Sequence, residues 1–246
     1  MKKPLNDKEW GAHYNIGILD SVVRSVTSGQ LSVQTQEILS ITKENDKVLE
    51  IGCGSGASSL ALAAHNRQAT ALDYAEECVN LVRSAATSLS VELAVHHHDA
   101  MLNLPFPDNE FDVVFHAGLL EHFEFSDRVK LLRNWSRVGK KMISLVPNAA
   151  SLAYRVGKAK MEKDETWPYG LEIPIYSQHS DFAEAGLRVL QEYTIGASHA
   201  LEFLPKLSPL RIVLNHWLNH NFCGDNCGQG YLLVTVGEKF EIKKSI

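Results

Sequence analysis

Seven residues from Glu50 to Gly56, in the order Glu-Ile-Gly-Cys-Gly-Ser-Gly, carry the clearest chemical signal in this chain of 246 residues. They follow a short apolar run, Lys47–Ile51, that is typical of a buried strand. They precede Ala57–Ala64, whose small and aliphatic residues suit a helix packed on a sheet. Glycines at such a junction let the backbone turn tightly and approach a ligand that a Cβ would block. The segment therefore predicts a ligand-binding turn between a strand and a helix.

The acid at the start of this turn indicates which ligand it suits. The spacing is GxGxG with Glu50 two residues ahead, whereas dinucleotide-binding turns have GxGxxG. A pyrophosphate needs backbone N–H groups at a helix N-terminus without a carboxylate beside them. Glu50 would repel a phosphate and would suit a cationic ligand, such as an amino acid with its ammonium group. These features argue against a nicotinamide oxidoreductase.

Two aspartates end the next two expected strands. Asp73 lies 17 residues after the last glycine of the turn, close to the spacing at which an acid accepts hydrogen bonds from ribose hydroxyls. Asp99 stands where a carboxylate can accept from an adenine amino group, while the N–H of Ala100 serves a ring nitrogen. The alternative for both aspartates is a helix cap or a turn. The ends of adjacent parallel strands meet at the place where open α/β sheets bind ligands.

The elements that must position these groups alternate between apolar runs and segments of helical periodicity. This alternation predicts repeated βαβ units, a mainly parallel sheet and helices on both of its faces. The last two strands, separated by a long excursion, are expected to pair antiparallel at an edge. Strands are expected at Lys47–Ile51, Ala69–Asp73, Val91–Asp99, Phe111–His116, Lys140–Pro147, Arg188–Tyr193 and Tyr231–Gly237.

Composition limits the classes of function. The chain is 45% hydrophobic and 22% charged with a net charge of −5, which describes a globular protein and disfavours a dedicated nucleic-acid binder. No apolar run approaches the roughly 18 residues of a membrane span, and no apolar stretch follows the lysines at the start. Four scattered cysteines do not indicate a secreted disulfide scaffold. We therefore expect a cytoplasmic protein, either a monomer or a homodimer.

The region from Asp46 to Asn148 resembles the class I S-adenosylmethionine-dependent methyltransferases, in particular their small-molecule, UbiE-like branch. The segments that carry the resemblance, in order, are VLEIGCGSG, ALD, HHDA and LPFPDNEFDVVFHAGLLEHF. The resemblance implies an α/β fold with a Rossmann-like, seven-stranded, mostly parallel sheet, helices on both faces and an antiparallel last strand. It also implies S-adenosylmethionine as the cofactor and S-adenosylhomocysteine as the product.

By position, the resemblance assigns the methionine part of the cofactor to the turn, the ribose to Asp73, and the adenine to Asp99 and Ala100. It places Tyr74 against the adenine face and His116 with Ala117 on the sulfonium side. The expected cofactor-binding residues are Glu50, Gly52, Cys53, Gly54, Gly56, Asp73, Tyr74, Asp99, Ala100, His116 and Tyr14.

The resemblance also divides the chain, which we expect to form one domain over residues 1–246. Its parts are an N-terminal helical lid (1–45), a cofactor-binding core (46–147), two acceptor-pocket insertions (148–176 and 195–229) and the last strand (230–237). Aromatic residues in the insertions either line an apolar pocket or form the loops' own small core. These are Trp167, Pro168, Tyr169 and Phe203.

Methyl transfer to a hydroxyl or an ammonium group is helped by a base whose pKa is near the working pH, most often a histidine. The candidate catalytic residues are His122, His116 and His179, with His13 and His199 as further histidines of the same expected region. A structural role for His122 stays open, because the Leu-Glu-His triplet recurs in the family whatever the acceptor.

The leading hypothesis is methyl transfer to an oxygen or nitrogen of a small molecule. The alternatives are a cofactor-binding protein without catalysis, or a methyltransferase of RNA or protein; the acidic balance and the HAGL segment, in place of an Asn/Asp-Pro-Pro-Tyr motif, disfavour the latter. No metal is expected. The run His216, His220, Cys223 and Cys227 contains zinc-binding residue types, but its order is unusual for a zinc site.

Overall fold

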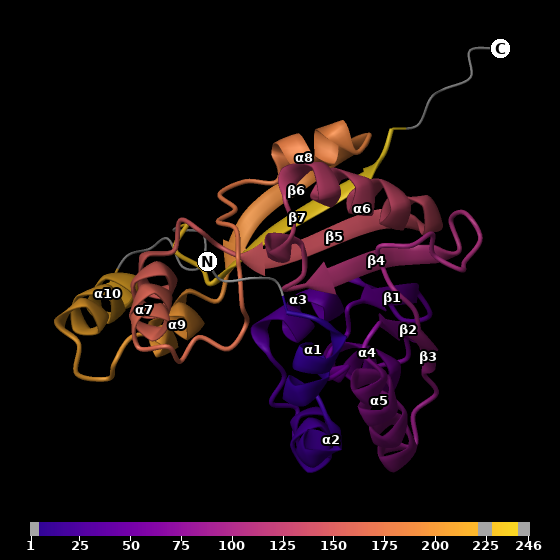
Figure 1. The fold of residues 1–246 in the computed structure, drawn as a ribbon, viewed down its shortest axis with the longest axis horizontal. Coiled ribbons are helices and arrows are strands. Elements are labelled where there is room, and N and C mark those ends of the chain that lie inside the picture. Colours follow the sequence, from indigo (N-terminus) through magenta and orange to yellow (C-terminus); the bar gives the residue numbers. More distant parts are fainter. Residues whose placement is uncertain (1–4, 221–227, 241–246) are drawn as a thin grey trace.

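The computed structural model describes residues 5–220 and 228–240, and these ranges form a seven-stranded sheet with helices around it (Figure 1). The strand order is β3-β2-β1-β4-β5-β7-β6. Pairs from β3 to β5 are parallel, whereas β7 is antiparallel to both of its neighbours. The expected Rossmann-like α/β sheet with an antiparallel last strand is confirmed. None of the helices in the described ranges is long and apolar enough to cross a membrane.

The elements follow one another along the chain as βαβ units preceded by a helical segment. In order they are α1 (Asp7–His13), η1 (Ile16–Ile18), α2 (Leu19–Thr27), α3 (Val33–Ile41), β1 (Lys47–Ile51), α4 (Ala57–Ala64), β2 (Gln68–Asp73), α5 (Glu76–Leu89), β3 (Ala94–His97), β4 (Phe111–Ala117), η2 (Leu120–His122), α6 (Phe125–Val138), β5 (Gly139–Pro147), α7 (Leu152–Lys163), α8 (His179–Glu184), β6 (Leu187–Ile195), α9 (Ala197–Ala200), η3 (Leu201–Phe203), α10 (Pro209–His220) and β7 (Leu232–Lys239).

The central strands alternate buried side chains between two cores. Leu49 and Ile51 of β1 join the cluster beneath α6 and α8, whereas Val48 joins the cluster beneath α3 and α4. This alternation follows from the period of two along a strand. Both faces of the strand are buried, which is why its sequence is almost continuously apolar.

The strand predictions hold within a few residues, and the largest differences lie at β3 and in the first insertion. The strand expected at Val91–Asp99 is only Ala94–His97. The segment 148–176, expected as an acceptor-pocket insertion with no regular element assigned to it, contains the helix α7. Its Gly157 weakens the helical signal, yet a Cβ there would stand 2.4 Å from the carbonyl oxygen of Phe203. This glycine lets η3 pack directly against α7.

The second insertion packs on the first rather than on the sheet. α7, α9, η3 and α10 form a separate helical lobe beside the sheet (Figure 1), with Ala153, Ala200, Leu201 and Leu204 in its core. Trp167 and Phe203 pack against Tyr154 in the same lobe. Trp167 and Phe203 therefore belong to the insertions' own small core, which was the alternative to lining an apolar pocket.

A buried ion pair joins the two helices on the α6 face. The guanidinium Nε of Arg128 in α6 donates to Oδ1 of Asp181 in α8, and both side chains are at least nine-tenths buried. Arg128 also donates to the carbonyl oxygen of Phe123, two residues before α6 begins, 3.0 Å away. The pair therefore fixes the position of the chain that leads into α6.

Asp181→Ala should lower the free energy of unfolding by about 3–5 kcal/mol, because it leaves the Arg128 charge buried without its partner. Asp164→Ala breaks an exposed pair with Lys160 and should cost less than about 1 kcal/mol. Urea denaturation of both variants measures the difference. An equal loss of unfolding free energy in the two variants would show that the buried pair stabilises the fold no more than an exposed one.

Candidate active site

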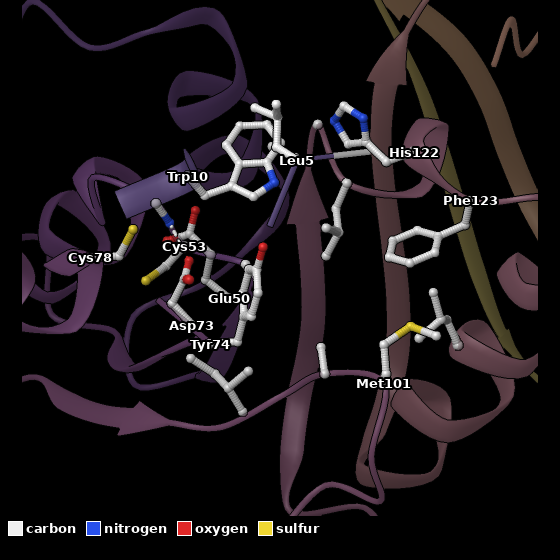
Figure 2. A pocket seen from close by; sticks show the side chains of 18 of the residues that line it. Leu5, Trp10, Glu50, Cys53, Asp73, Tyr74, Cys78, Met101, His122 and Phe123 are labelled. Atoms are coloured by element: carbon white, nitrogen blue, oxygen red, sulfur yellow. Dashed lines mark hydrogen bonds between the residues drawn. The ribbon is translucent and has the colours of Figure 1, made fainter. Parts of the chain in front are cut away.

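A cavity of about 580 Å³ opens at the carboxyl ends of β1, β2 and β4, and cavities of this size hold small-molecule ligands. Figure 2 shows Glu50, Asp73 and Tyr74 on one side and His122 with Phe123 on the other. Nine of the expected cofactor-binding residues line it: Glu50, Gly52, Cys53, Gly54, Asp73, Tyr74, Asp99, Ala100 and Tyr14. Their location agrees with the expectation, while their binding roles stay predictions.

The glycine turn is possible only without side chains. Gly52, Gly54 and Gly56 have φ values of +65°, +52° and +66°, which L-residues with a Cβ rarely adopt. A Cβ on Gly56 would stand 2.4 Å from Cγ2 of Val82 in α5, and one on Gly54 would stand 3.1 Å from the ring of Tyr14. Gly56 therefore supports the turn from behind, although it does not line the cavity.

The carboxylate of Glu50 lies below the turn and is held by the helix that follows. Its Oε2 accepts hydrogen bonds from the backbone N–H of Ser59 at 3.0 Å and from the Ser59 hydroxyl at 2.6 Å. Loss of hydration on burial raises the pKa of Glu50 to about 7, against the lowering effect of these hydrogen bonds. A cationic group in the cavity would favour the ionised form of this carboxylate.

Asp73 connects the turn to the end of β2. Its Oδ2 accepts from the N–H of Gly54 at 2.8 Å and its Oδ1 accepts from the N–H of Ala75 at 2.9 Å. Burial raises its pKa. A carboxylate has lone pairs left after two such bonds, so Asp73 can also accept from ribose hydroxyls. It thus acts as a turn aspartate and remains available to a ligand.

The residues after β3 provide the expected adenine side. Oδ1 of Asp99 accepts from the N–H of Met101 at 2.8 Å. The carbonyl oxygen of Ala100 accepts from Nε1 of Trp135 in α6 at 3.0 Å. The loop between β3 and β4 is therefore attached to α6, which keeps Asp99 and Ala100 at the cavity wall.

Aromatic side chains of the N-terminal segment cover the cavity next to the glycine turn. Trp10 and Tyr14 both line the cavity and stack with centroids 6.4 Å apart and an interplanar angle of 6°. Trp10 also meets His122 edge to face at 5.3 Å. Burial raises the pKa of Tyr14, so its hydroxyl is neutral at physiological pH. Residues of the segment 1–45 therefore line the cavity, while its role as a lid stays a prediction.

His122 is the histidine that lines the cavity among the described residues. Its Nδ1 lies 2.6 Å from the carbonyl oxygen of Leu171, and a carbonyl can only accept, so Nδ1 carries the proton. The neutral ring therefore has its lone pair on Nε2. Burial lowers the pKa of His122, which keeps the ring neutral and able to accept a proton at neutral pH.

His116 is not in the site, and the expectation that it binds the sulfonium side or catalyses is wrong. Ala117 lines the cavity, but neighbouring residues of a strand point to opposite faces. His116 therefore points into the core beside Trp135, where its Nε2 lies 2.7 Å from the Ser144 hydroxyl. Complete burial lowers its pKa to about 3.

Three further candidate histidines also lie outside the cavity lining. His179 is exposed at the start of α8, with its Nε2 3.7 Å from Glu192, so its expected catalytic role has no support in the fold. His199 packs against Phe203 and Tyr231 in the helical lobe. His13 packs against Trp10 and Tyr169 near the cavity mouth.

The expected acceptor-pocket insertions contribute unequally. Leu171 and Ile173, from the segment 148–176, line the cavity. No described residue of 195–229 does, so the part of this segment in the acceptor pocket stays a prediction. His216 and His220 stack on α10 with centroids 4.1 Å apart, whereas Cys223 and Cys227 lie outside the described residues.

Sequence reasoning did not identify the apolar residues that line the cavity around His122. Leu119 and Phe123 flank His122 in the chain, and Leu171 and Ile173 come from the distant insertion. The LLEHF segment signalled the first two by sequence proximity. No local pattern indicates the last two, because their place at the wall depends on how the insertion folds back.

Comparison with known proteins agrees with this geometry. Residues 48–142 match the family model described as "Methyltransferase domain". An uncharacterized methyltransferase of Bacillus subtilis, YcgJ, is 33% identical over 95 residues, which is 39% of this chain and 37% of that protein. The 27-O-demethylrifamycin SV methyltransferase of Amycolatopsis mediterranei is 29% identical over 160 residues, 60% of this chain and 57% of the relative. The matches thus span less than two thirds of either relative.

Solved structures share the fold at low identity. The crystal structure of YcgJ superimposes with a TM-score of 0.52 at 21% identity, covering 85% of this chain and 99% of that one. The structure of the [4+2]-cyclase SpnF gives a TM-score of 0.63 at 17% identity, covering 96% and 97%. At these identities the superpositions show the fold alone.

Gly56→Ala should destabilise the chain by about 2–5 kcal/mol, because positive φ costs about 1–2 kcal/mol and the contact with Val82 adds overpacking. Gly29→Ala is the matched control, since Gly29 has φ +70° with no atom within 4 Å of a Cβ. Gly29→Ala should lose only the roughly 1–2 kcal/mol of unfolding free energy that positive φ costs. Thermal or urea unfolding compares the two, and equal losses would contradict the close packing behind the turn.

The pKa of Glu50 gives a pH-dependent stability of the ligand-free chain. A folded pKa of about 7 lies above the ordinary value of 4.5, so the folded state binds the proton more tightly than the unfolded state. Stability relative to Glu50→Gln should therefore fall as pH rises from 4.5 to 7, by on the order of 3 kcal/mol. A difference between the two proteins that does not change with pH would contradict the burial of this carboxyl.

Proposed function

We propose that this chain, which carries a class I S-adenosylmethionine-dependent methyltransferase domain, transfers a methyl group to an oxygen or nitrogen of a small, largely apolar acceptor. One observation carries the proposal. The same cavity has the glycine turn with Asp73 and Asp99 on one side, and His122 in an apolar wall on the other. Cofactor and acceptor sites that adjoin in this way are what a direct transfer requires.

The residues present fit S-adenosylmethionine. The glycine turn leaves room that a Cβ would fill, and the carboxylate of Glu50 complements an ammonium group rather than a phosphate. Asp73 would accept from the ribose hydroxyls. Asp99 and Ala100 would hold the adenine, with Tyr74 beside it. When bound, the cofactor supplies a methyl group already activated on a sulfonium.

The chain's own part in such a reaction is alignment, exclusion of water and acceptance of a proton. The stacked rings of Trp10 and Tyr14 cover the cavity and limit the access of water. Leu119, Phe123 and Ile173 orient an apolar acceptor by contact. Nε2 of His122 is the atom that takes the acceptor's proton, because the Leu171 carbonyl fixes the other nitrogen as the donor.

The charges of the lining restrict the acceptor. It contains five carboxylates, those of Glu50, Asp73, Asp99, Glu124 and Asp127, and no lysine or arginine among the described residues. A phosphorylated or carboxylated acceptor would be repelled, whereas a neutral or cationic one would not. The same charge balance disfavours RNA as a substrate. We therefore propose a neutral or cationic hydroxyl or amine compound.

A protein that binds the cofactor without transferring its methyl group is the second candidate. The observation that favours it is the fold shared with SpnF, which is a [4+2]-cyclase rather than a methyltransferase by name. Methyl transfer from radiolabelled S-adenosylmethionine to a panel of neutral phenols, alcohols and amines separates the two. Cofactor binding without label transfer to any of them would favour the second candidate.

Asp73→Asn should weaken S-adenosylhomocysteine binding by on the order of 10- to 100-fold, because it removes a charge-assisted acceptor for the ribose hydroxyls. Asp164→Asn, an exposed change far from the cavity, should bind as the wild type does. Isothermal titration calorimetry measures both, with NAD as a competitor ligand. Tight binding of NAD would contradict the proposed cofactor site. So would wild-type affinity of the Asp73→Asn variant for S-adenosylhomocysteine.

His122→Gln should reduce kcat by about 10²–10⁴ while leaving S-adenosylhomocysteine affinity near the wild-type value, because a base acts on the proton and not on cofactor binding. His179→Gln is the matched control and should leave kcat unchanged, since His179 lies outside the cavity lining. Single-turnover assays with an accepted substrate give kcat. A wild-type rate for His122→Gln would eliminate this imidazole as the base.

A further inference from the structure

Three side chains with metal-binding atoms lie together behind the acceptor wall. Glu121 and His122 belong to η2, and Glu172 comes from the segment between α7 and α8. One donor atom from each lies within 4.8 Å of the other two. Glu121 and Glu172 do not line the cavity, whereas His122 does, so the cluster adjoins the acceptor wall through this histidine.

The hydrogen bond of His122 matches that of a metal ligand. Histidines that bind metals commonly donate their other ring N–H to a backbone carbonyl or a carboxylate, which fixes the ring orientation. Nδ1 of His122 is bonded in this way to the Leu171 carbonyl, and Nε2 lies 3.9 Å from Oε1 of Glu121. The lone pair of Nε2 is therefore on the side of the Glu121 carboxylate.

Glu121 supplies an independent sign of a missing partner. Its residue is 3% exposed, and its Oε2 has no hydrogen-bond partner among the described residues. Burying an unpaired carboxylate is costly, and buried carboxylates are normally paired or bound to a metal.

We propose that Glu121, His122 and Glu172 bind one divalent first-row transition-metal ion. Two carboxylates and one imidazole suit Mn²⁺ or Fe²⁺. Ligand bonds near 2.0–2.2 Å place the donor atoms about 3–3.5 Å apart, so the widest separation in the cluster has to close by about 1.5 Å. Water would complete the coordination.

Lys158 is the competing cation. Its Nζ lies 3.5 Å from Oε2 of Glu172, but 3.1 Å from Oε1 of Glu162, one turn further along α7. Nζ also lies over the ring of Trp167 at 5.2 Å. The closer ion pair with Glu162 and the contact with Trp167 hold the ammonium when an ion takes Glu172.

Coordination would use the lone pair of Nε2, so metal binding and proton acceptance by His122 exclude each other. The methyl-transfer assays proposed above therefore apply to the metal-free chain, kept in a chelator. The metal site itself rests on the cluster geometry and not on the proposed transfer. The two proposals can fail separately.

The test titrates the chelator-treated, dialysed full chain with MnCl₂ and follows free Mn²⁺ by electron paramagnetic resonance. We expect one Mn²⁺ per chain in the wild type and at least about tenfold weaker binding in Glu172→Gln, because even residues that only orient metal ligands change affinity 10- to 100-fold. Lys158→Met removes the competing ammonium and should tighten binding. Glu165→Gln, an exposed change in the same segment, should bind as the wild type does.

S-adenosylhomocysteine binding in each variant, measured without metal, shows that the fold and the cofactor site are intact. Glu121→Gln repeats the test at the most buried ligand. The metal site is refuted if the wild type binds no Mn²⁺, or if Glu172→Gln binds it as Glu165→Gln does. Weaker binding in Lys158→Met would refute it as well, because the lysine would then act as part of the site rather than as a competitor.

Discussion

The close contact between the turn after β1 and the helix α5 is the constraint on which the rest of the site depends. Gly56 has positive φ and stands so near Val82 that no side chain fits between them. This contact places the start of α4 at the sheet, which brings Ser59 to Glu50 and the N–H of Gly54 to Asp73. One backbone geometry thus arranges two buried carboxylates at the edge where parallel strands end.

Negative charge is the second organising feature of the molecule. Each carboxylate on the cofactor side accepts hydrogen bonds from backbone N–H or hydroxyl groups, so no cation is needed in the cavity to hold it. The cavity therefore keeps an acidic lining that matches an ammonium group and hydroxyls. Behind the opposite wall, Glu121 lacks such compensation. For this reason we expect the acids near the glycine turn to bind the cofactor, and we propose a metal ion for Glu121 and Glu172.

The two insertions differ in what their described residues contact. The segment after β5 reaches back over the sheet, and the N–H of Ile173 donates to the carbonyl of Glu121 at 2.7 Å. This bond holds the acceptor wall against η2. The segment after β6 instead completes the lobe around α7, where Gly157 permits direct packing on Phe203. Among the described residues of the two insertions, those that line the cavity come from the first.

The sequence by itself determined the α/β sheet, the strand positions and the cavity position of the glycine turn, Asp73, Asp99 and His122. These features depend on local rules: period-two burial, glycine where φ is positive, and acids at strand ends. Tertiary structure decided the rest. The pleat turned His116 into the core, and long-range packing put His179 outside the site. The folded-back insertion brought Leu171 and Glu172 to His122, because contacts between residues about 50 apart leave no local pattern in the sequence.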